Sequence, residues 1–250
     1  MIEEQIFKYL GHCANVMKLS LILPVYKSKH YLEKNLPIIY DYLNSLSLSF
    51  EILIAEDESR DIFSENIISF IKKHKEIKFI HSPIRLGRGR AIKNSVEILN
   101  GDIIGYMDID LATDIRYLKK VVELFEEKNY DLITGSRYLK HSKATRSIKR
   151  RIFSLFFNSL IMIMFNSKVH DHQCGFKFFR KDFIKKYGKI ANNDYWFWDT
   201  EIILIAQMNK KKVYELPVEW KESRRTTVKI FSDTLIYLKE ILRFYLQNNF

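Results

Sequence analysis

Hydrophobic and polar positions follow two different periods along the first half of the chain. Short apolar runs at 19–25 and 50–55 are typical of buried strands, and the apolar positions of 31–46 between them recur with the spacing of one helical face. The same order then repeats, with expected helices at 64–74, 89–99 and 115–128 and expected strands at 77–81, 103–107 and 131–135. This alternation predicts an α/β domain with a mostly parallel central sheet and helices on both faces.

The second half of the chain has a different pattern. Residues 152–165 form an apolar segment behind a basic cluster, and the segment is too short to span a bilayer. It predicts either a core helix or an amphipathic helix at a lipid interface. A helix at 199–209, a strand at 213–220 and a helix at about 232–246 complete the body. We expect an N-terminal extension at 1–17, one domain at 18–230 and a C-terminal amphipathic helix at 231–250.

Composition agrees with one large domain and constrains the partners. The 250 residues carry a formal net charge of +11, which predicts attraction to nucleic acid, nucleotide phosphates or an acidic membrane face. Because no nucleic-acid recognition module is present, we expect no nucleic-acid partner. Cys13 and Cys174 lie far apart, so neither a disulfide framework nor a zinc site is indicated. The acidic start and the lack of a long apolar run predict a protein that is cytoplasmic or lies on a membrane.

Two carboxylates separated by one residue follow the apolar run at 103–107. The side-chain period of a strand sends Asp108 and Asp110 to the same side of the chain, where two oxygen ligands suit Mg²⁺ or Mn²⁺ bound to a diphosphate. The alternative is a solvated turn in which Asp114 caps the next helix. Asp57 follows the second strand, and ligands of such sheets bind at the carboxyl ends of the strands.

Five separated segments bring glycines, arginines and carboxylates to these strand ends. They are Leu-Ile-Leu-Pro-Val-Tyr at 21–26, Ile-Ala-Glu-Asp-Glu-Ser-Arg-Asp at 54–61, Arg-Leu-Gly-Arg-Gly-Arg-Ala at 85–91, Tyr-Met-Asp-Ile-Asp-Leu at 106–111 and Gly-Ser-Arg-Tyr at 135–138. Together they resemble the nucleotide-sugar domain of inverting glycosyltransferases of family two, which have the GT-A fold. The resemblance covers about residues 18–230.

Three later segments look like the polyprenyl-phosphate branch of that family, which contains dolichyl-phosphate mannose and glucose synthases. They are Arg-Arg-Ile-Phe-Ser-x-x-x-Asn at 150–158, Asp-x-Gln-Cys-Gly-Phe-Lys-Phe at 171–178 and Trp-Asp-Thr-Glu at 198–201. The resemblance implies inverting transfer of a hexose from a nucleoside diphosphate sugar to a polyprenyl or dolichyl phosphate, at the cytoplasmic face of a membrane. Asp108 and Asp110 would hold the divalent cation that neutralises the departing diphosphate.

The resemblance also implies a role for individual residues. Pro24 and Tyr26 would form a wall for the nucleotide base, and Asp57 would accept hydrogen bonds from base or ribose. Gly87 and Gly89 would allow close backbone approach before a helix N-terminus. Arg85 and Arg88 would add positive charge near the phosphates, and the following residues complete the implied site: Arg137, Arg150 and one of Arg224 or Arg225 at the acceptor phosphate, Asp171, Gln173 and Lys177 in an acceptor loop, and Asp199 orienting the sugar or the arginines.

The chain also departs from the family pattern. Lys27-Ser28 stands where family members often carry Asn-Glu, and Ala112 stands where mannose-phosphate synthases have a further metal ligand. The Leu-Ala-Thr sequence after Asp110 is more similar to the glucosyl branch. It favours UDP-glucose as the donor, with GDP-mannose as the other candidate. Nothing in the sequence predicts an oligomeric state.

Several other interpretations stay open at this stage. One is a family-two enzyme with a sugar hydroxyl acceptor, which would need a carboxylate base such as Asp199. Another is a catalytically silent relative that binds nucleotide sugar as a scaffold. His170, Asp171 and His172 suggest a metal site, although no spaced second pair of ligands accompanies them. Glu201 is interpreted either as a residue orienting the site or as an exposed helix residue.

Overall fold

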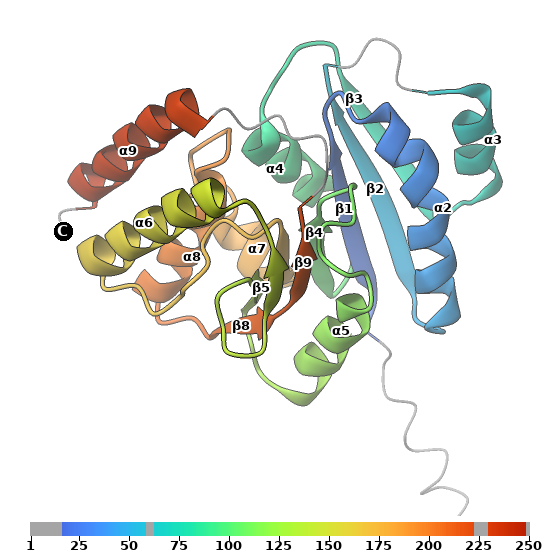
Figure 1. Cartoon of the computed structure of the whole chain (residues 1–250). Coiled ribbons are helices and arrows are strands. Elements are labelled where there is room, and N and C mark those ends of the chain that lie inside the picture. Colours follow the sequence, from blue (N-terminus) through green and yellow to red (C-terminus); the bar gives the residue numbers. More distant parts are fainter. Residues whose placement is uncertain (1–16, 59–62, 223–229, 249–250) are drawn as a thin grey trace, which may run out of the picture.

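The computed structural model describes residues 17–58, 63–222 and 230–248 (Figure 1). Their centre is a sheet with the strand order β3-β2-β1-β4-β7-β5-β8. The strands are β1 (Leu19–Val25), β2 (Phe50–Asp57), β3 (Ile77–Ser82), β4 (Ile103–Met107), β5 (Leu132–Ser136), β7 (Phe176–Arg180) and β8 (Val213–Pro217). Neighbours pair in parallel except at β7, which is antiparallel to both β4 and β5. The expected mostly parallel sheet is confirmed.

Helices cover both faces of this sheet, as expected (Figure 1). One face packs against α2 (Lys29–Ser45), α3 (Glu65–Lys73) and α5 (Tyr117–Glu127), and the other against α4 (Arg88–Ile98), α7 (Lys181–Tyr187) and α8 (Trp198–Met208). In α2, the predicted apolar face is buried at Leu32, Leu36, Ile39 and Leu43. Two separate apolar clusters result, one on each side of the sheet, and they hold the strand ends in fixed positions.

The chain between 213 and 220 corrects one expectation. Instead of one strand it forms two, β8 and β9 (Glu219–Lys221), and β9 pairs with β6 (Lys143–Thr145) outside the main sheet. Val218 is the point of transfer: its N–H donates to the carbonyl of Ser136 at 3.1 Å, and its own carbonyl accepts from the N–H of Lys143 at 3.2 Å. The apolar pattern runs through both strands, so it did not reveal the change of partner.

The apolar segment at 152–165 forms a helix with one buried side and one exposed apolar side, so its place in the core is shown and its contact with lipid stays a prediction. Helix α6 (Ile148–Phe165) buries Phe157 and Ile161 against the core, while Ile152 is 60% exposed and Ile163 is 80% exposed. The C-terminal helix α9 (Ile230–Gln247) packs beside it, with the rings of Phe165 and Phe244 5.7 Å apart. No helix in the described part of the chain combines the length and apolarity needed to cross a bilayer.

Candidate active site

The end of β4 places Asp108 and Asp110 at the carboxyl edge of the parallel strands. The Asp108 N–H donates to the carbonyl of Gly175 at 3.1 Å, so the loop after residue 170 lies directly against this edge. The Asp108 side chain keeps 39% of its surface accessible. Burial of the group, together with the nearby charges of Asp110 and Asp199, raises the pKa of Asp108 to about 6 despite the opposing charge of Arg88. Negative charge is therefore concentrated here.

These carboxylates fit a cation whose remaining ligands come from elsewhere. Among the described residues, no cluster of three or more His, Cys, Asp or Glu side chains forms a complete protein cage. Mg²⁺ commonly binds one or two carboxylates and completes its shell with phosphate oxygens and water, and Mn²⁺ accepts the same hard ligands. The Asp110 Oδ1 atom accepts a 3.0 Å hydrogen bond from the N–H of Ala112, which fixes the carboxylate at the start of the loop.

Arg88 lies beneath the acidic edge. Its Nη2 atom is 3.1 Å from Asp108 Oδ1 and 3.9 Å from Asp199 Oδ2, and its guanidinium lies over the rings of Tyr106 and Trp196. Burial alone would lower the pKa of Arg88, but the two carboxylates raise it overall. Asp199 itself is only 2% exposed and hydrogen-bonds to the Tyr106 hydroxyl. Tyr106 begins the motif at 106–111, but the sequence assigned it no role.

The glycine-rich turn before α4 is shaped by Asp57. Its two carboxylate oxygens accept from the N–H groups of Leu86 at 2.6 Å and Gly87 at 2.8 Å. Gly87 has φ +94°, a conformation that side chains disfavour, and a Cβ there would lie 2.4 Å from the carbonyl oxygen of Asp194. Asp57 therefore builds the turn, and the direct contact with base or ribose that the sequence suggested stays a prediction.

The predicted base wall lies at the end of β1. Pro24 is half-buried in the strand, and the half-buried Tyr26 ring carries the Arg85 guanidinium 4.4 Å from its centroid and the Lys27 ammonium 5.1 Å away. The structure thus brings Tyr26 and Arg85 together, and the aromatic wall is covered by two cations.

The predicted acceptor loop is held from within by buried charges. Arg137 donates to Asp171 through Nε at 2.7 Å and through Nη2 at 2.8 Å, and its backbone N–H adds a third bond at 2.9 Å. Burial would raise the pKa of Asp171, but Arg137 lowers it overall. Lys177 was expected in this loop but lies in β7, and its fully buried ammonium donates to the carbonyls of His172 and Cys174 at 3.0 and 2.7 Å. Arg137, Asp171 and Lys177 therefore fix the loop in place.

A pocket of about 310 Å³ opens beside this loop. Three cations line it, Arg137, Arg146 and Arg151, together with Tyr138, Leu139, Ser142, Ala144 and Leu155. The Arg137 and Arg146 guanidinium groups lie 5.3 and 5.7 Å from the Trp220 ring, and Trp220 forms a β-bridge with Thr113 in the loop after Asp110. One aromatic residue thus connects the acidic edge to this arginine pocket.

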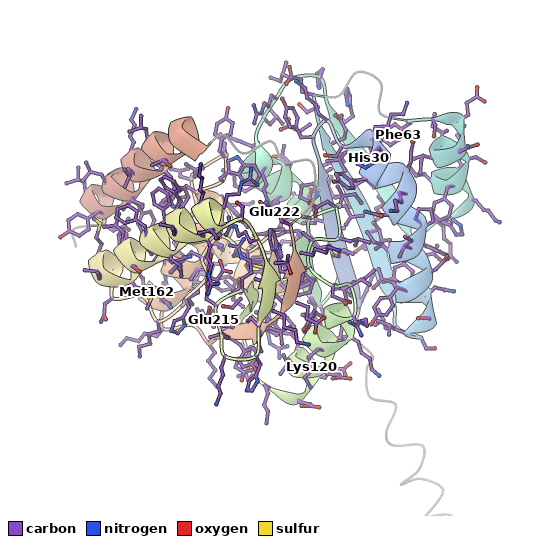
Figure 2. All side chains as sticks on the ribbon, in the orientation of Figure 1. His30, Phe63, Lys120, Met162, Glu215 and Glu222 are labelled. Carbon is purple, nitrogen blue, oxygen red and sulfur yellow. The ribbon has the colours of Figure 1, made fainter. Side chains whose placement is uncertain are left out.

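The basic cluster at the beginning of α6 was the sequence signal for Arg146 and Arg151, but only Arg150 was selected there. The Arg150 Nη1 atom donates to Glu222, which is labelled in Figure 2, at 2.5 Å. Neither residue lines the pocket. Arg224 and Arg225 lie outside the described residues.

The run His170, Asp171 and His172 does not converge on one point. His170 hydrogen-bonds to Glu215, and Asp171 pairs with Arg137. His172 accepts at Nε2 from the Ser167 hydroxyl at 2.8 Å and donates from Nδ1 to Asn158 at 2.9 Å, an assignment that follows from these partners. The metal-site interpretation of this run is therefore not supported by the geometry.

Comparison with known proteins defines the class. Residues 20–188 match the family described as Glycosyl transferase family 2, and the chain belongs to this family. Glycosyltransferase AglD of Haloferax volcanii is 34% identical over 233 residues, which are 92% of this chain and 37% of AglD. Dolichyl-phosphate beta-glucosyltransferase ALG5A of Trichomonas vaginalis is 32% identical over 221 residues, 85% of this chain and 68% of that protein. The chain thus spans well under half of AglD.

Solved structures agree on the fold. Glucosyl-3-phosphoglycerate synthase from Mycobacterium tuberculosis, in complex with Mn²⁺, uridine diphosphate and phosphoglyceric acid, has a TM-score of 0.67 at 11% identity, covering 91% of this chain and 78% of that one. Mannosyl-3-phosphoglycerate synthase from Rubrobacter xylanophilus has a TM-score of 0.65 at 12% identity, covering 98% and 77%. The expected family and the GT-A fold are confirmed.

Proposed function

We propose that this chain transfers a hexose from a nucleoside diphosphate sugar to a polyprenyl or dolichyl phosphate, with inversion at the anomeric carbon. The observation that carries the proposal is the arginine pocket, where three cations and the apolar side chains of Leu139 and Leu155 suit a phosphate attached to a hydrocarbon chain. The relatives named dolichyl-phosphate beta-glucosyltransferases support this acceptor. They also favour UDP-glucose as the donor over GDP-mannose.

The exposed apolar side of α6 and α9 supports a membrane location. Residues on this side are more than half exposed although they are large and apolar: Ile148, Ile152, Phe156 and Ile163 on α6, and Leu235, Ile236, Leu242 and Leu246 on α9. Arg146 and Arg151 lie at the beginning of α6, where anionic headgroups and a lipid phosphate would be attracted. In this proposal the helices lie on the membrane surface and deliver the acceptor phosphate to the pocket.

The acceptor needs little activation in this reaction. A phosphate monoester has its second ionisation near pH 6, so at neutral pH its oxygen can attack the anomeric carbon without a general base while the bond to the diphosphate breaks. Asp108 and Asp110 would hold Mg²⁺ or Mn²⁺, which supplies Lewis-acid neutralisation of the departing diphosphate. Arg88 lies beside Asp108 and would add a further positive charge.

A sugar hydroxyl acceptor is the alternative, and the position of Asp199 argues against it. Such an acceptor would require a carboxylate within reach of the attacking hydroxyl. Asp199 is almost fully buried and is engaged by Tyr106, with Arg88 nearby. This arrangement suits an orienting role better than proton abstraction from a substrate.

A transfer assay tests the proposal directly. Radiolabelled UDP-glucose or GDP-mannose is supplied with a polyprenyl phosphate or with a free sugar, in Mn²⁺, in Mg²⁺ or in a chelator. We expect label to enter the lipid fraction from UDP-glucose, and only with a divalent cation. Transfer to the free sugar in the absence of lipid would instead favour the hydroxyl-acceptor enzyme.

A pair of variants tests the arginine pocket itself. Arg146→Met removes a pocket cation, and we expect the KM for the lipid phosphate to rise about tenfold or more because one charge-assisted contact is lost. The KM for the donor should stay close to that of the wild type. Lys119→Met is the matched control, since Lys119 is an exposed cation on α5. A rise confined to the donor KM would show that the pocket serves another ligand.

A further inference from the structure

The loop 192–196, between α7 and α8, packs against the glycine-rich turn. The carbonyl of Asp194 accepts from the N–H of Arg90 at 3.1 Å, and its carboxylate binds the Arg90 guanidinium through two bonds of 2.9 Å. A Cβ at Gly89 would lie 2.6 Å from the carbonyl oxygen of Asn193, so backbone packs directly on backbone. The shape of the turn therefore depends on where this loop lies.

The other side of the loop is fastened to the C-terminal helix. Glu201 is 1% exposed and accepts from the N–H of Asn193 at 2.7 Å and from Arg243 Nη2 of α9 at 2.6 Å. The Asn193 side-chain amide donates to Glu240 of α9 at 2.9 Å. Glu240 of α9 thus holds Asn193 directly, and Arg243 of α9 holds it through the buried Glu201 carboxylate.

The same helix reaches the predicted acceptor loop. The Tyr237 hydroxyl hydrogen-bonds to Thr200 and to the side chain of Gln173. Tyr237 is buried against Phe157 of α6, with the ring centroids 5.1 Å apart. A single helix therefore contacts the segments on the donor side and on the acceptor side of the site.

Burying the charged carboxylate of Glu201 costs free energy, so packing alone does not explain why a glutamate holds the helix here. Burial raises the pKa of Glu201 against the opposing charge of Arg243, which shows that the charged form depends on its partners. Apolar residues of similar volume often stabilise a core as well as a buried ion pair does, whereas a buried pair can select one register. The pair between Glu201 and Arg243 therefore suits the task of defining position.

We propose that Glu201 and Arg243 are positioning residues of the donor site. Through Asn193 they hold the loop 192–196 against the turn at Gly87 and Gly89. The position of α9 therefore determines how well the turn binds a diphosphate. The inference rests on the proposed function, because it takes the turn as the place where the donor nucleotide binds.

Nucleotide titration of the full chain tests this inference. UDP and GDP, each with Mn²⁺, are titrated calorimetrically into the wild type, Glu201→Gln, Arg243→Met and Arg243→Lys. We expect about five- to tenfold weaker binding in Glu201→Gln and Arg243→Met, and recovery of most of the affinity in Arg243→Lys, which keeps the charge. Lys239→Met is the matched control with unchanged binding, because Lys239 is an exposed cation on the same helix.

The outcomes separate the two proposals. A folded Arg243→Met protein that binds nucleotide as the wild type does would overturn the positioning role and leave the proposed function intact. If Arg243→Met does not fold, Glu201→Gln decides, since its one amide oxygen can still accept from the Asn193 N–H while the charge and the acceptor for Arg243 are lost. A wild type that binds neither nucleotide would overturn the proposed function and this inference with it. In the transfer assay, the positioning role also requires a higher donor KM with kcat within about twofold.

Discussion

Arg88 and Arg137 are both buried arginines paired with an aspartate, but the two pairs differ on the acidic side. Arg137 and Asp171 form two side-chain hydrogen bonds, and their side chains are 6% and 0% exposed. Arg88 meets Asp108 through one 3.1 Å contact, and the Asp108 side chain is 39% exposed. The Arg137–Asp171 pair is closed because its carboxylate is fully buried, whereas the Arg88–Asp108 pair is open because its carboxylate is accessible to a ligand.

The difference assigns the pairs to different tasks. Opening a closed, buried pair leaves an uncompensated charge, so the Arg137–Asp171 pair acts as a fixed part of the loop 171–175. Arg88 lies beside two carboxylates, those of Asp108 and Asp199, and the Asp108 carboxylate is accessible, so the charges can be redistributed when a ligand binds. Two similar motifs at one site thus define a rigid frame and an adaptable contact.

The largest expected effect is a loss of stability on breaking the closed pair. Asp171→Asn leaves Arg137 buried without its anionic partner, and we expect the free energy of unfolding to fall by about 3–5 kcal/mol. Chemical denaturation measures it. Glu97→Gln breaks the exposed pair with Lys189 and serves as the control, with a change inside experimental error. A small loss in Asp171→Asn would remove the distinction between the two pairs.

The second expected effect is on activity and belongs to the open pair. Asp108→Asn removes a charge that would hold the cation, and we expect transfer to fall by about 10²–10³-fold, the cost typical of losing one electrostatic contact to the departing group. The free energy of unfolding should stay near the wild-type value, because the substitution also relieves repulsion with Asp110 and Asp199. Normal turnover in saturating Mn²⁺ would contradict the role of Asp108.

The third expected effect compares the same substitution in the two pairs. Lysine keeps the charge but loses the forked donor geometry of arginine. Arg88→Lys should weaken UDP binding by about tenfold, or roughly 1.4 kcal/mol, with little change in stability. Arg137→Lys should lower stability and leave UDP binding unchanged. Calorimetric titration and chemical denaturation of both variants measure the two quantities, and a reversed pattern would exchange the roles.

Much of the fold could be predicted because its periodicity is local. The strand at 19–25 and the strand at 103–107 agree with β1 and β4 to the residue, since apolar runs bounded by turns report burial on both faces. The strand β7 was not predicted, because the resemblance placed Lys177 in a loop, although the strand's phenylalanines are apolar and buried. Its antiparallel pairing with β4 and β5 depends on the preceding loop, which the buried Lys177 of β7 holds through the carbonyl of His172, and a local pattern does not encode such a contact.

The sequence indicated which residues belong to the candidate site better than it indicated what each residue does. Tyr26, Arg85, Arg88, Asp108 and Asp110 could be selected from their motifs at strand ends. That Asp57 builds a turn and that Glu201 is buried depended on partners 30 and 42 positions away, respectively. The sequence does not show whether a charged residue lies on a solvated face or in a buried pair. The interpretation of Glu201 as an exposed helix residue was therefore possible, and the structure shows it to be wrong.

The smallest expected effect is a pH dependence of the closed region. Burial lowers the pKa of His172 to about 3, so the folded protein holds a neutral imidazole while the unfolded chain protonates near pH 6.5. Protons then bind preferentially to the unfolded state, and stability is complete above pH 6.5 and falls toward pH 3. The loss of stability reaches a slope of about 1.4 kcal/mol per pH unit, and the loss at pH 5.5 amounts to about 1.4 kcal/mol.

Denaturation between pH 7 and 5 should show a flatter slope of stability against pH for His172→Gln than for the wild type, while His30→Gln, at an exposed position, retains the slope. An unchanged slope in His172→Gln would mean that another group carries the dependence and that the network with Ser167 and Asn158 accepts a charged ring.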